Sequence, residues 1–371
     1  MRDTLAERLL AKVMDWKPED IRAHRLRLEA LASFKYDEYQ KFSPGMRFIE
    51  SLALWLRQFQ PEERIAAYNL VIHKLIFISS SEMAHFVASA YPDFIRPILI
   101  REAARILNIS SSSVKKVLTN PEFSVLLRRS LFLGLSDGSH IDLFRRSNPA
   151  LSNEQVWQTY EISETKAEDL SNNLNKDVGQ IRDAHSEKGV KFQVVCLLDD
   201  FSASGISYLR KDDSGEFKGK ISGFLEKLQR EDSLGRIIDR KDLLICVVLF
   251  VATTLAIERI RANLDDWIKS KGLKFRYDVI AIQQVGERSR LTETYDNEVI
   301  QIASKYFDAA IVDEHYRKGR CQKPYLGFDE CSLPVVIYHN APNNSLPILW
   351  FDEGLKYRGL FPRVRRHKES I

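Results

Sequence analysis

The sequence contains few cysteines, and no two of them are spaced as a pair. Four cysteines stand among 371 residues, at positions 196, 246, 321 and 331, and no CxxC motif occurs. Cys196 and Cys246 lie inside apolar runs that are typical of strands. This pattern favours ordinary buried thiols over a zinc site. A chain of this length can also bury a full core without disulfides or metals.

A long apolar run and a hydrophobic leader are also missing. The longest uncharged apolar stretch spans residues 243–257, which is shorter than the run of about 18 to 20 residues that a membrane-spanning helix needs. The opening residues, MRDTLAERLL, alternate charge with leucine and lack the apolar core of a signal peptide. We therefore expect a soluble, cytoplasmic protein with reduced thiols and no membrane contact.

The chain has no large excess of charge of one sign. It carries 55 Lys and Arg against 51 Asp and Glu, a balance that permits anionic ligands but does not require nucleic acid. The basic tail at residues 363–368 could touch nucleic acid, but a solvated terminus is the favoured interpretation. The HExxH and Walker motifs are missing as well. Nucleic acid is therefore not expected as a direct ligand.

The first 125 residues have the periodicity of helices. In residues 45–59 the apolar side chains recur at intervals of three and four, which gives one apolar face. Pro61 is predicted to begin another helix, whose apolar positions run as far as Ile76. Ser79 fits the start of a third helix, with a capping box. This predicted domain, residues 1–125, is interpreted as a helical docking or lid region.

From about residue 126 the pattern changes to strands that alternate with helices. Apolar segments that are typical of strands occur at residues 130–138, 191–200, 243–251, 275–285 and 333–340. Continuous apolar strands with helices between them predict an α/β fold, in which a parallel sheet is flanked by helices. Ligands on such sheets bind beyond the carboxyl ends of the strands. Residues 126–371 are therefore predicted to form the ligand-binding domain.

One segment, VVCLLDDFSASGIS at residues 194–207, carries a specific signal. An apolar strand ends in Asp199 and Asp200, and a turn of small and hydroxyl-bearing residues follows at 204–207. Such a turn presents backbone N–H groups to a phosphate, and a helix predicted at 206–209 would add its dipole. Glycine lets the backbone approach the phosphate closely. The alternative is an acidic loop that merely caps a helix.

This segment resembles the motif of type I phosphoribosyltransferases that binds 5-phosphoribosyl-1-pyrophosphate (PRPP), with serines in place of two threonines. The resemblance implies that Asp199 and Asp200 hold the ribose 2′ and 3′ hydroxyls. It also implies Mg²⁺ on the pyrophosphate, with the same two carboxylates as candidate ligands. The residues that would wrap the 5-phosphate are Ala203, Ser204, Gly205, Ile206 and Ser207.

The wider chain resembles phosphoribosyltransferase-like proteins of bacterial antiphage conflict loci. The resemblance covers residues from about 125 to 366 and includes FLGLSDGSHIDLFRRSN, the acid loop and LPVVIYHNAPNNSLPILWF. It implies a role in antiviral defence, sometimes beside an ATPase or a reverse transcriptase. Such a partner protein would be expected to dock on the helical N-terminal region.

Two further segments are candidates for the rest of the ligand. Ser136, Asp137 and Gly138 follow the first predicted strand, where type I enzymes place a pyrophosphate loop, and Arg145 and Arg146 could neutralise phosphate oxygens. The alternative is a turn with a solvated arginine pair, since a clear copy of the usual pyrophosphate loop is missing.

The second segment is HNAPNNSLPILW, at residues 339–350. The amides of Asn340, Asn343 and Asn344 could meet the edge of a nucleobase or acceptor, and Trp350 could stack on it. The same asparagines are also typical of a tight turn.

Two functions from different classes follow. The first is a Mg²⁺-dependent phosphoribosyltransferase-like enzyme that transfers or cleaves an N-glycosidic bond on a nucleotide-type substrate. The second is a catalytically silent module that senses PRPP or a nucleotide and regulates a partner protein. Both functions use the acid loop. The weak pyrophosphate loop favours sensing, whereas the presence of both acids favours chemistry.

Overall fold

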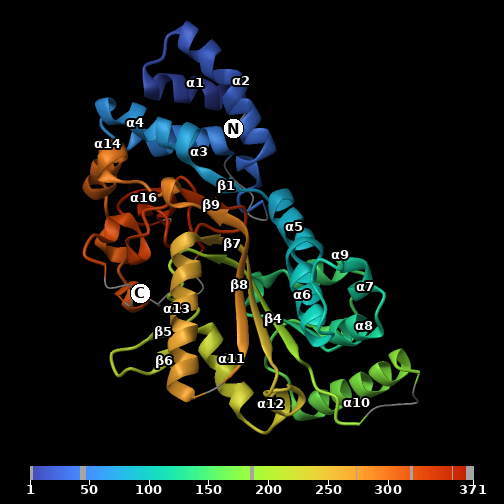
Figure 1. Cartoon of the computed structure of the whole chain (residues 1–371). Coiled ribbons are helices and arrows are strands. Elements are labelled where there is room, and N and C mark those ends of the chain that lie inside the picture. Colours follow the sequence, from blue (N-terminus) through green and yellow to red (C-terminus); the bar gives the residue numbers. More distant parts are fainter. Residues whose placement is uncertain are drawn as a thin grey trace. The chain divides into compact units, whose positions relative to one another are not determined.

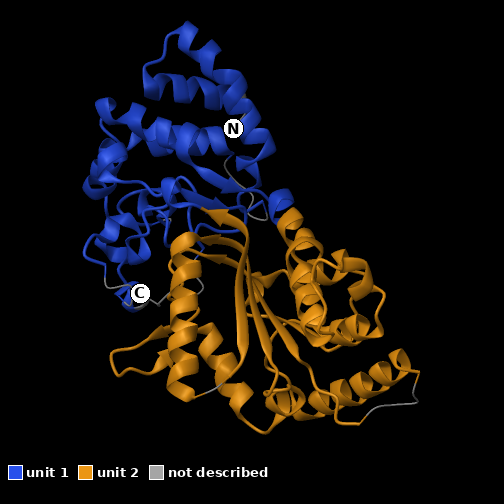
Figure 2. Ribbon diagram, viewed as in Figure 1, with its two compact units in different colours: residues 1–83, 286–371 blue, residues 84–285 orange. Residues whose placement is uncertain are grey.

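The computed structural model describes residues 3–41, 47–183, 188–272, 274–317, 321–352 and 354–364. The chain divides into two compact units, one formed by residues 84–285 and the other by residues 1–83 together with 286–371 (Figure 2). The predicted mixed α/β fold is confirmed, with a parallel sheet, flanking helices and a helical N-terminal region (Figure 1).

A five-stranded parallel sheet is the centre of the unit formed by residues 84–285. Its strand order is β3-β2-β4-β7-β8, and every neighbouring pair is parallel. The strands are β2 (Ser130–Gly134), β3 (Val156–Trp157), β4 (Val194–Ser202), β7 (Leu244–Thr253) and β8 (Arg276–Val285). The strand that carries the acid pair, β4, is therefore the middle strand of the sheet.

The apolar strands are buried because helices cover both faces of the sheet. All ten residues of β7 are buried, as are the first six of β4. On one face the strands pack against helices α10, α11 and α13, which contribute Leu174, Phe224 and Ile260 to one apolar cluster. On the other face Phe132 packs against Tyr91 and Phe144, with ring centroids 6.3 and 5.3 Å away.

The remaining elements lie before β2, where α5 to α8 are found, or in the connections between the strands. A two-stranded antiparallel hairpin, β5 (Arg210–Lys211) with β6 (Phe217–Lys218), follows β4. The helices are α5 (Ser80–Ser89), α6 (Arg96–Ile106), α7 (Val114–Leu118), α8 (Pro121–Arg128), α9 (Ile141–Ser147), α10 (Glu164–Ile181), α11 (Lys220–Gln229), α12 (Ser233–Ile237) and α13 (Thr254–Lys271).

Two of the cysteines face each other inside this sheet. Cys196 of β4 pairs in register with Cys246 of β7, and both are 0% exposed. Burial raises the pKa of the Cys196 thiol well above its usual range, and the neighbouring Cys246 adds to the rise. Both thiols are free, as the sequence predicted.

The other unit is built from both ends of the chain. Its elements are α1 (Asp3–Met14), α2 (Pro18–Phe34), α3 (Phe48–Arg57), α4 (Arg64–Asn69), β1 (Ile76–Ile78), α14 (Glu293–Lys305), α15 (Glu314–Arg317), β9 (Val335–Ile337) and α16 (Pro347–Trp350). Strand β1 pairs in parallel with β9. The ring of Tyr36 packs against Phe48, Phe77 and Phe361 in the core of this unit.

Two details of the sequence prediction are wrong here. The apolar segment at residues 333–340 was expected in the main parallel sheet, but its central residues form β9, which pairs with β1 instead. Ile76 was expected in a helix, but it begins β1, because the helical path ends at Lys74. Local apolar spacing cannot reveal either feature, since both depend on pairing between residues far apart in the sequence.

The units do not follow the order of the chain. Residues 84–125 belong to the same compact unit as the five-stranded sheet, and residues 286–371 belong with the N-terminal helices. Compactness alone does not decide which segment folds independently, so the division near residue 125 stays a prediction. Among the described residues, no helix has the length and apolar character needed to cross a membrane.

Candidate functional site

Asp199 lies near the carboxyl end of β4 and is held by groups from three segments. Ser136 Oγ donates to Asp199 Oδ1 at 2.5 Å, and the backbone N–H of Asp200 donates to the same oxygen at 3.2 Å. Tyr208 Oη donates to Asp199 Oδ2 at 2.7 Å, and Lys220 Nζ also donates to it. The residue is 0% exposed. Asp199 is therefore the buried centre of a polar cluster.

Burial dominates the ionisation of this cluster. It raises the pKa of the Asp199 carboxyl, and repulsion from Asp200 raises it further, whereas Lys220 and Ser136 lower it. Burial also raises the pKa of the Tyr208 hydroxyl well above its usual range, so this group stays protonated and donates. The lysine is the one counterion in contact with the buried carboxylate among the described residues. Removing it would leave a buried charge uncompensated.

Asp200 has a different environment from its neighbour. Its side chain is half-buried, and its Oδ1 accepts a hydrogen bond from the backbone N–H of Phe201 at 2.7 Å. A β-carbon added at Gly138 would lie 2.5 Å from Asp200 Oδ2, so a larger residue at 138 would require the Asp200 carboxylate to shift. The structure thus brings the loop at 136–138 and the acid pair together, as expected for neighbouring parallel strands.

Helix α13 holds the backbone of the predicted phosphate turn. Thr253 Oγ1 donates to the carbonyl oxygen of Ala203 at 2.5 Å, and Arg259 Nη1 donates to that of Ser204 at 2.7 Å. Gly205 has φ +74°, and a β-carbon there would lie 3.0 Å from the carbonyl oxygen of Ala256. A larger residue at 205 would therefore disturb the packing of the turn on α13 even without a phosphate.

The predicted helix at 206–209 is wrong. The N–H groups of Tyr208 and Leu209 both donate to the carbonyl oxygen of Gly205, which closes one turn, and the chain then enters the β5–β6 hairpin. A helix dipole is therefore not available from these residues. Within the described part of the chain, no group accepts a hydrogen bond from the backbone N–H of Gly205 or Ser207. Ser207 is exposed, so its N–H is open to a phosphate, whereas Gly205 is buried.

The hydroxyls of the turn are placed differently from each other. Ser204 is 3% exposed and its Oγ accepts from the N–H of Ile206 at 3.4 Å, whereas Ser207 is exposed. Ile206 is half-buried. Only the Ser207 hydroxyl is therefore presented to solvent.

Tyr208 and Lys220 were missed by the sequence analysis. Lys220 is the first residue of α11, and its Nζ lies 4.9 Å from the ring centroid of Tyr208. The residue before it, Gly219, has φ +123°, and a β-carbon there would lie 2.5 Å from the carbonyl oxygen of Tyr208. The sequence feature that could have indicated this lysine is the pair of Gly219 and Lys220 at the start of α11. The contact itself joins residues 21 positions apart and has no local signature.

Residues 134–138 read GLSDG, which also matches the G-x-S-x-G pattern of a hydrolase nucleophile elbow. An elbow places its serine in a strained turn, but Ser136 has φ −157° and ψ 174°, which is extended backbone. Its hydroxyl donates to a carboxylate rather than to an imidazole. The match therefore does not indicate a serine hydrolase.

The predicted arginine pair lies on α9. Arg145 Nη2 forms an exposed ion pair with Asp142 at 3.1 Å, and Arg146 is exposed. Asp137, in the loop between β2 and α9, is exposed as well. The pyrophosphate role of these residues stays a prediction.

The predicted base-recognition segment lies in the other compact unit. Asn340 Oδ1 accepts from the N–H groups of Ala341 and Val364. Asn344 is 8% exposed and its Nδ2 donates to the carbonyl oxygen of Phe328.

The remaining two candidates of this segment are also held locally. The carbonyl oxygen of Asn343 accepts from Phe328 N at 2.8 Å. Trp350 is 2% exposed, and its Nε1 donates to the carbonyl oxygen of Ser345 at 2.7 Å. All of these contacts hold local structure, so a role in stacking on a base would require Trp350 to become exposed.

The candidate metal ligands were also Asp199 and Asp200. The described residues contain no group of three or more His, Cys, Asp or Glu side chains that could hold a metal ion. Mg²⁺ in phosphate sites usually uses one or two carboxylates together with the phosphates of the ligand. The ammonium of Lys220 already stands against Asp199, so Asp200 fits the part of a metal ligand better.

Comparison with known proteins gives one match. The model of the PRTase-CE family matches residues 52–363. This range includes every residue of the polar cluster around Asp199. Neither a curated protein nor a solved structure matches the chain.

Proposed function

Because the chain belongs to the PRTase-CE family, which is phosphoribosyltransferase-like, we propose that it binds PRPP or a ribose-5-phosphate nucleotide at residues 199–207. The observation that carries this proposal is the meeting of three features at the carboxyl edge of the sheet. An acid pair, the close glycine loop at 136–138 and the unpaired backbone N–H of the exposed Ser207 lie on neighbouring strand connections.

The two acids have different tasks in this proposal. Asp200 accepts hydrogen bonds from the ribose hydroxyls, because it is half-buried beside Gly138. The oxygens of Asp199 already accept bonds from Ser136, Tyr208 and Lys220. A ribose hydroxyl could reach Asp199 only by displacing one of these donors. Asp199 is therefore proposed mainly as a positioning residue for the lysine.

The proposed reaction is transfer of the ribosyl group from PRPP to a nitrogen nucleophile. The bond between C1 and the pyrophosphate oxygen breaks, pyrophosphate leaves with the electron pair, and a C1–N bond forms. Positive charge develops near C1, so the protein acts chiefly by positioning the reactants and by electrostatic stabilisation. Mg²⁺, held by pyrophosphate oxygens and Asp200, would neutralise charge on the leaving group.

A second candidate function is sensing without turnover. The saturation of Asp199 by groups of the protein itself favours this alternative, because a resting site already closed on its own lysine is stable without a ligand. In that case the chain would report PRPP or a nucleotide to a partner protein. An antiphage role, in which an ATPase or a reverse transcriptase docks on the helical N-terminal region, is proposed from the family resemblance.

The test is calorimetry of the full chain with PRPP, in the presence and absence of Mg²⁺, followed by an assay of pyrophosphate release with nucleobase acceptors. Binding with turnover supports the transferase, and binding without turnover supports the sensor. If neither PRPP nor a ribose-5-phosphate nucleotide binds, the proposed function is wrong. Plaque assays on cells that carry the whole locus, with and without this chain, test the defence role separately.

A further inference from the structure

A cavity of about 500 Å³ lies at the opposite edge of the five-stranded sheet. Arg129 directly precedes β2, and Lys191 and Lys241 stand three residues before β4 and β7. These three strands are neighbours in the sheet and run in parallel. The cavity is therefore at the amino edge, whereas Asp200 lies towards the carboxyl edge. Strand β4, nine residues long, spans roughly 30 Å between the two edges.

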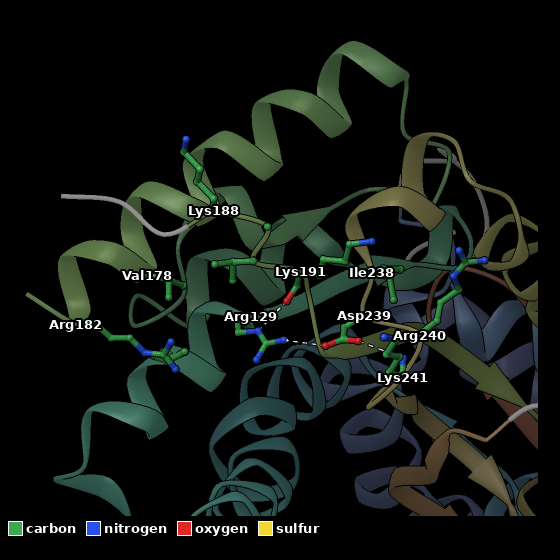
Figure 3. Close-up of a pocket in the computed structure, with 12 residues that line it drawn as sticks. Arg129, Val178, Arg182, Lys188, Lys191, Ile238, Asp239, Arg240 and Lys241 are labelled. Atoms are coloured by element: carbon green, nitrogen blue, oxygen red, sulfur yellow. Dashed lines mark hydrogen bonds and ion pairs between the residues drawn. The ribbon is translucent and has the colours of Figure 1, made fainter. Parts of the chain in front are cut away.

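The lining of this cavity is strongly cationic. A single carboxylate, Asp239, accompanies six cationic side chains. In Figure 3 it lies between Arg129 on one side and Arg240 and Lys241 on the other, whereas Lys188 points away from it. The cations come from four separate segments of the chain and are Arg129, Arg182, Lys188, Lys191, Arg240 and Lys241. Four apolar residues also line the cavity: Val190 is half-buried, and Val125, Val178 and Ile238 are at most 2% exposed.

Arg129 is largely buried, with 21% of its side chain exposed. Its Nε donates to the carbonyl oxygen of Lys191 at 2.7 Å, and its Nη2 lies 3.2 Å from Asp239 Oδ2 (Figure 3). Burial lowers the pKa of this guanidinium, and the charge of Arg182 lowers it further, although Asp239 opposes them. Asp239 is thus the partner of Arg129 and not of the other five cations.

Three of the cations have no acidic partner among the residues that the structure describes. Arg182 pairs with Glu122 at 2.8 Å, and Arg240 lies 3.4 Å from Glu231. Lys188, Lys191 and Lys241 form no ion pair with any residue in the described ranges of the chain. Like charges held around one cavity repel each other, and a bound anion removes that repulsion.

We propose that this cavity binds a chain of two or three phosphates, carried by a nucleotide or supplied as inorganic polyphosphate. Its volume lies in the range of about 300 to 1,000 Å³ typical of small-molecule sites, and its cations line one hollow. A nucleic-acid surface would instead present them along an extended stripe. This site is separate from the proposed PRPP site.

The experiment is calorimetry of ATP and of inorganic tripolyphosphate with the full chain at low salt. The test variant is Lys188→Ala/Lys191→Ala. The matched control, Lys115→Ala/Lys116→Ala, removes the same charge from exposed positions of α7. We expect ATP to bind the wild type and the control equally, and the test variant at least about tenfold more weakly, since bonds to charged groups are of that strength.

The other arms identify the source of the phosphates and can overturn the proposal. Tighter binding of ATP than of tripolyphosphate assigns the site to a nucleotide, and equal binding assigns it to phosphate chains alone. The proposal is wrong if neither binds, or if the test variant binds both as tightly as the control does. It is also wrong if a single-stranded oligonucleotide binds this face while ATP and tripolyphosphate do not.

Discussion

The two edges of the five-stranded sheet use charge in opposite ways. At the carboxyl edge the charge is internal, because the buried Asp199 is neutralised by Lys220 and surrounded by donors of the protein. At the amino edge cations gather around a cavity with one carboxylate, and three lysines have no acidic partner among the described residues. The charged groups at the carboxyl edge thus interact with each other inside the protein. At the amino edge the three lysines can interact with a ligand.

The largest expected effect is a difference in stability between two single variants, each of which removes one lysine from one edge of the sheet. Lys220→Met leaves the buried Asp199 without its counterion and should lower the free energy of unfolding by about 2 to 3 kcal/mol at neutral pH. Lys191→Met removes one of several neighbouring positive charges, and the free energy of unfolding should change by no more than about 0.5 kcal/mol. Urea denaturation of both variants measures the contrast. Equal losses of stability would show that the edges do not differ.

The pH dependence should sharpen this contrast. The pKa of Asp199 is raised in the folded state, so the folded protein binds that proton more tightly than the unfolded chain does. Stability linked to this group is present at low pH and is lost as pH rises through the raised pKa. Without Lys220 the pKa rises further. Lys220→Met should therefore be almost as stable as wild type near pH 4 and least stable, by comparison, near pH 8.

The next largest effect concerns the glycine that precedes Lys220. Gly219→Ala puts a β-carbon 2.5 Å from the carbonyl oxygen of Tyr208 in backbone with φ +123°, and such strain costs about 1 to 3 kcal/mol. Gly215→Ala is the matched control, because Gly215 also has positive φ but would meet nothing within 4 Å. Thermal unfolding should show the larger loss for Gly219→Ala. Equal losses would mean that strain, and not the contact with Tyr208, sets the effect.

The acid pair should separate binding from stability. Asp200→Asn is expected to weaken PRPP binding by about 1.5 to 3 kcal/mol, because a hydrogen bond to a charged group is lost, with little change in stability. Asp199→Asn acts on the buried cluster and should alter stability as well. The exposed Asp169→Asn on α10 serves as the charge control in calorimetry. If Asp200→Asn binds PRPP normally, the acid is not a ligand for the ribose.

The smallest effect is expected at Arg145. Its ion pair with Asp142 is exposed, so Arg145→Ala should change the free energy of unfolding by no more than about 0.5 kcal/mol. PRPP affinity should also stay unchanged, since the arginine is already paired at the surface. A clear loss of PRPP affinity in this variant would instead support the pyrophosphate role that the sequence suggested.

The sequence predicted those features that depend on local pattern. Apolar runs located β4 and β7, and the position of Asp199 and Asp200 at a strand end located the candidate site. The helix expected at 206–209 failed because the hydroxyl-rich turn that opens a helix equally suits a single turn before a hairpin. Such a choice depends on what the next residues pair with.

Features assembled from distant segments could not be predicted. Lys220 reaches Asp199 only because Gly219 permits an unusual backbone at the start of α11. The cations of the amino-edge cavity are scattered in the sequence, and each stands in a connection that looks like an ordinary solvated loop. Only the parallel order of β2, β4 and β7 brings three of them to one place.

The facing cysteines of β4 and β7 allow the opening of the sheet to be followed by thiol alkylation. Both thiols are completely buried, and the raised pKa of Cys196 keeps that sulfur protonated and unreactive. An alkylating reagent can therefore reach this pair only while the two central strands are apart. Cys321 is only half-buried and belongs to the other compact unit, so it should be labelled first. Cys331 is also buried but lies in the other unit. The delay before label enters Cys196 and Cys246 themselves then measures how often the middle of the sheet opens.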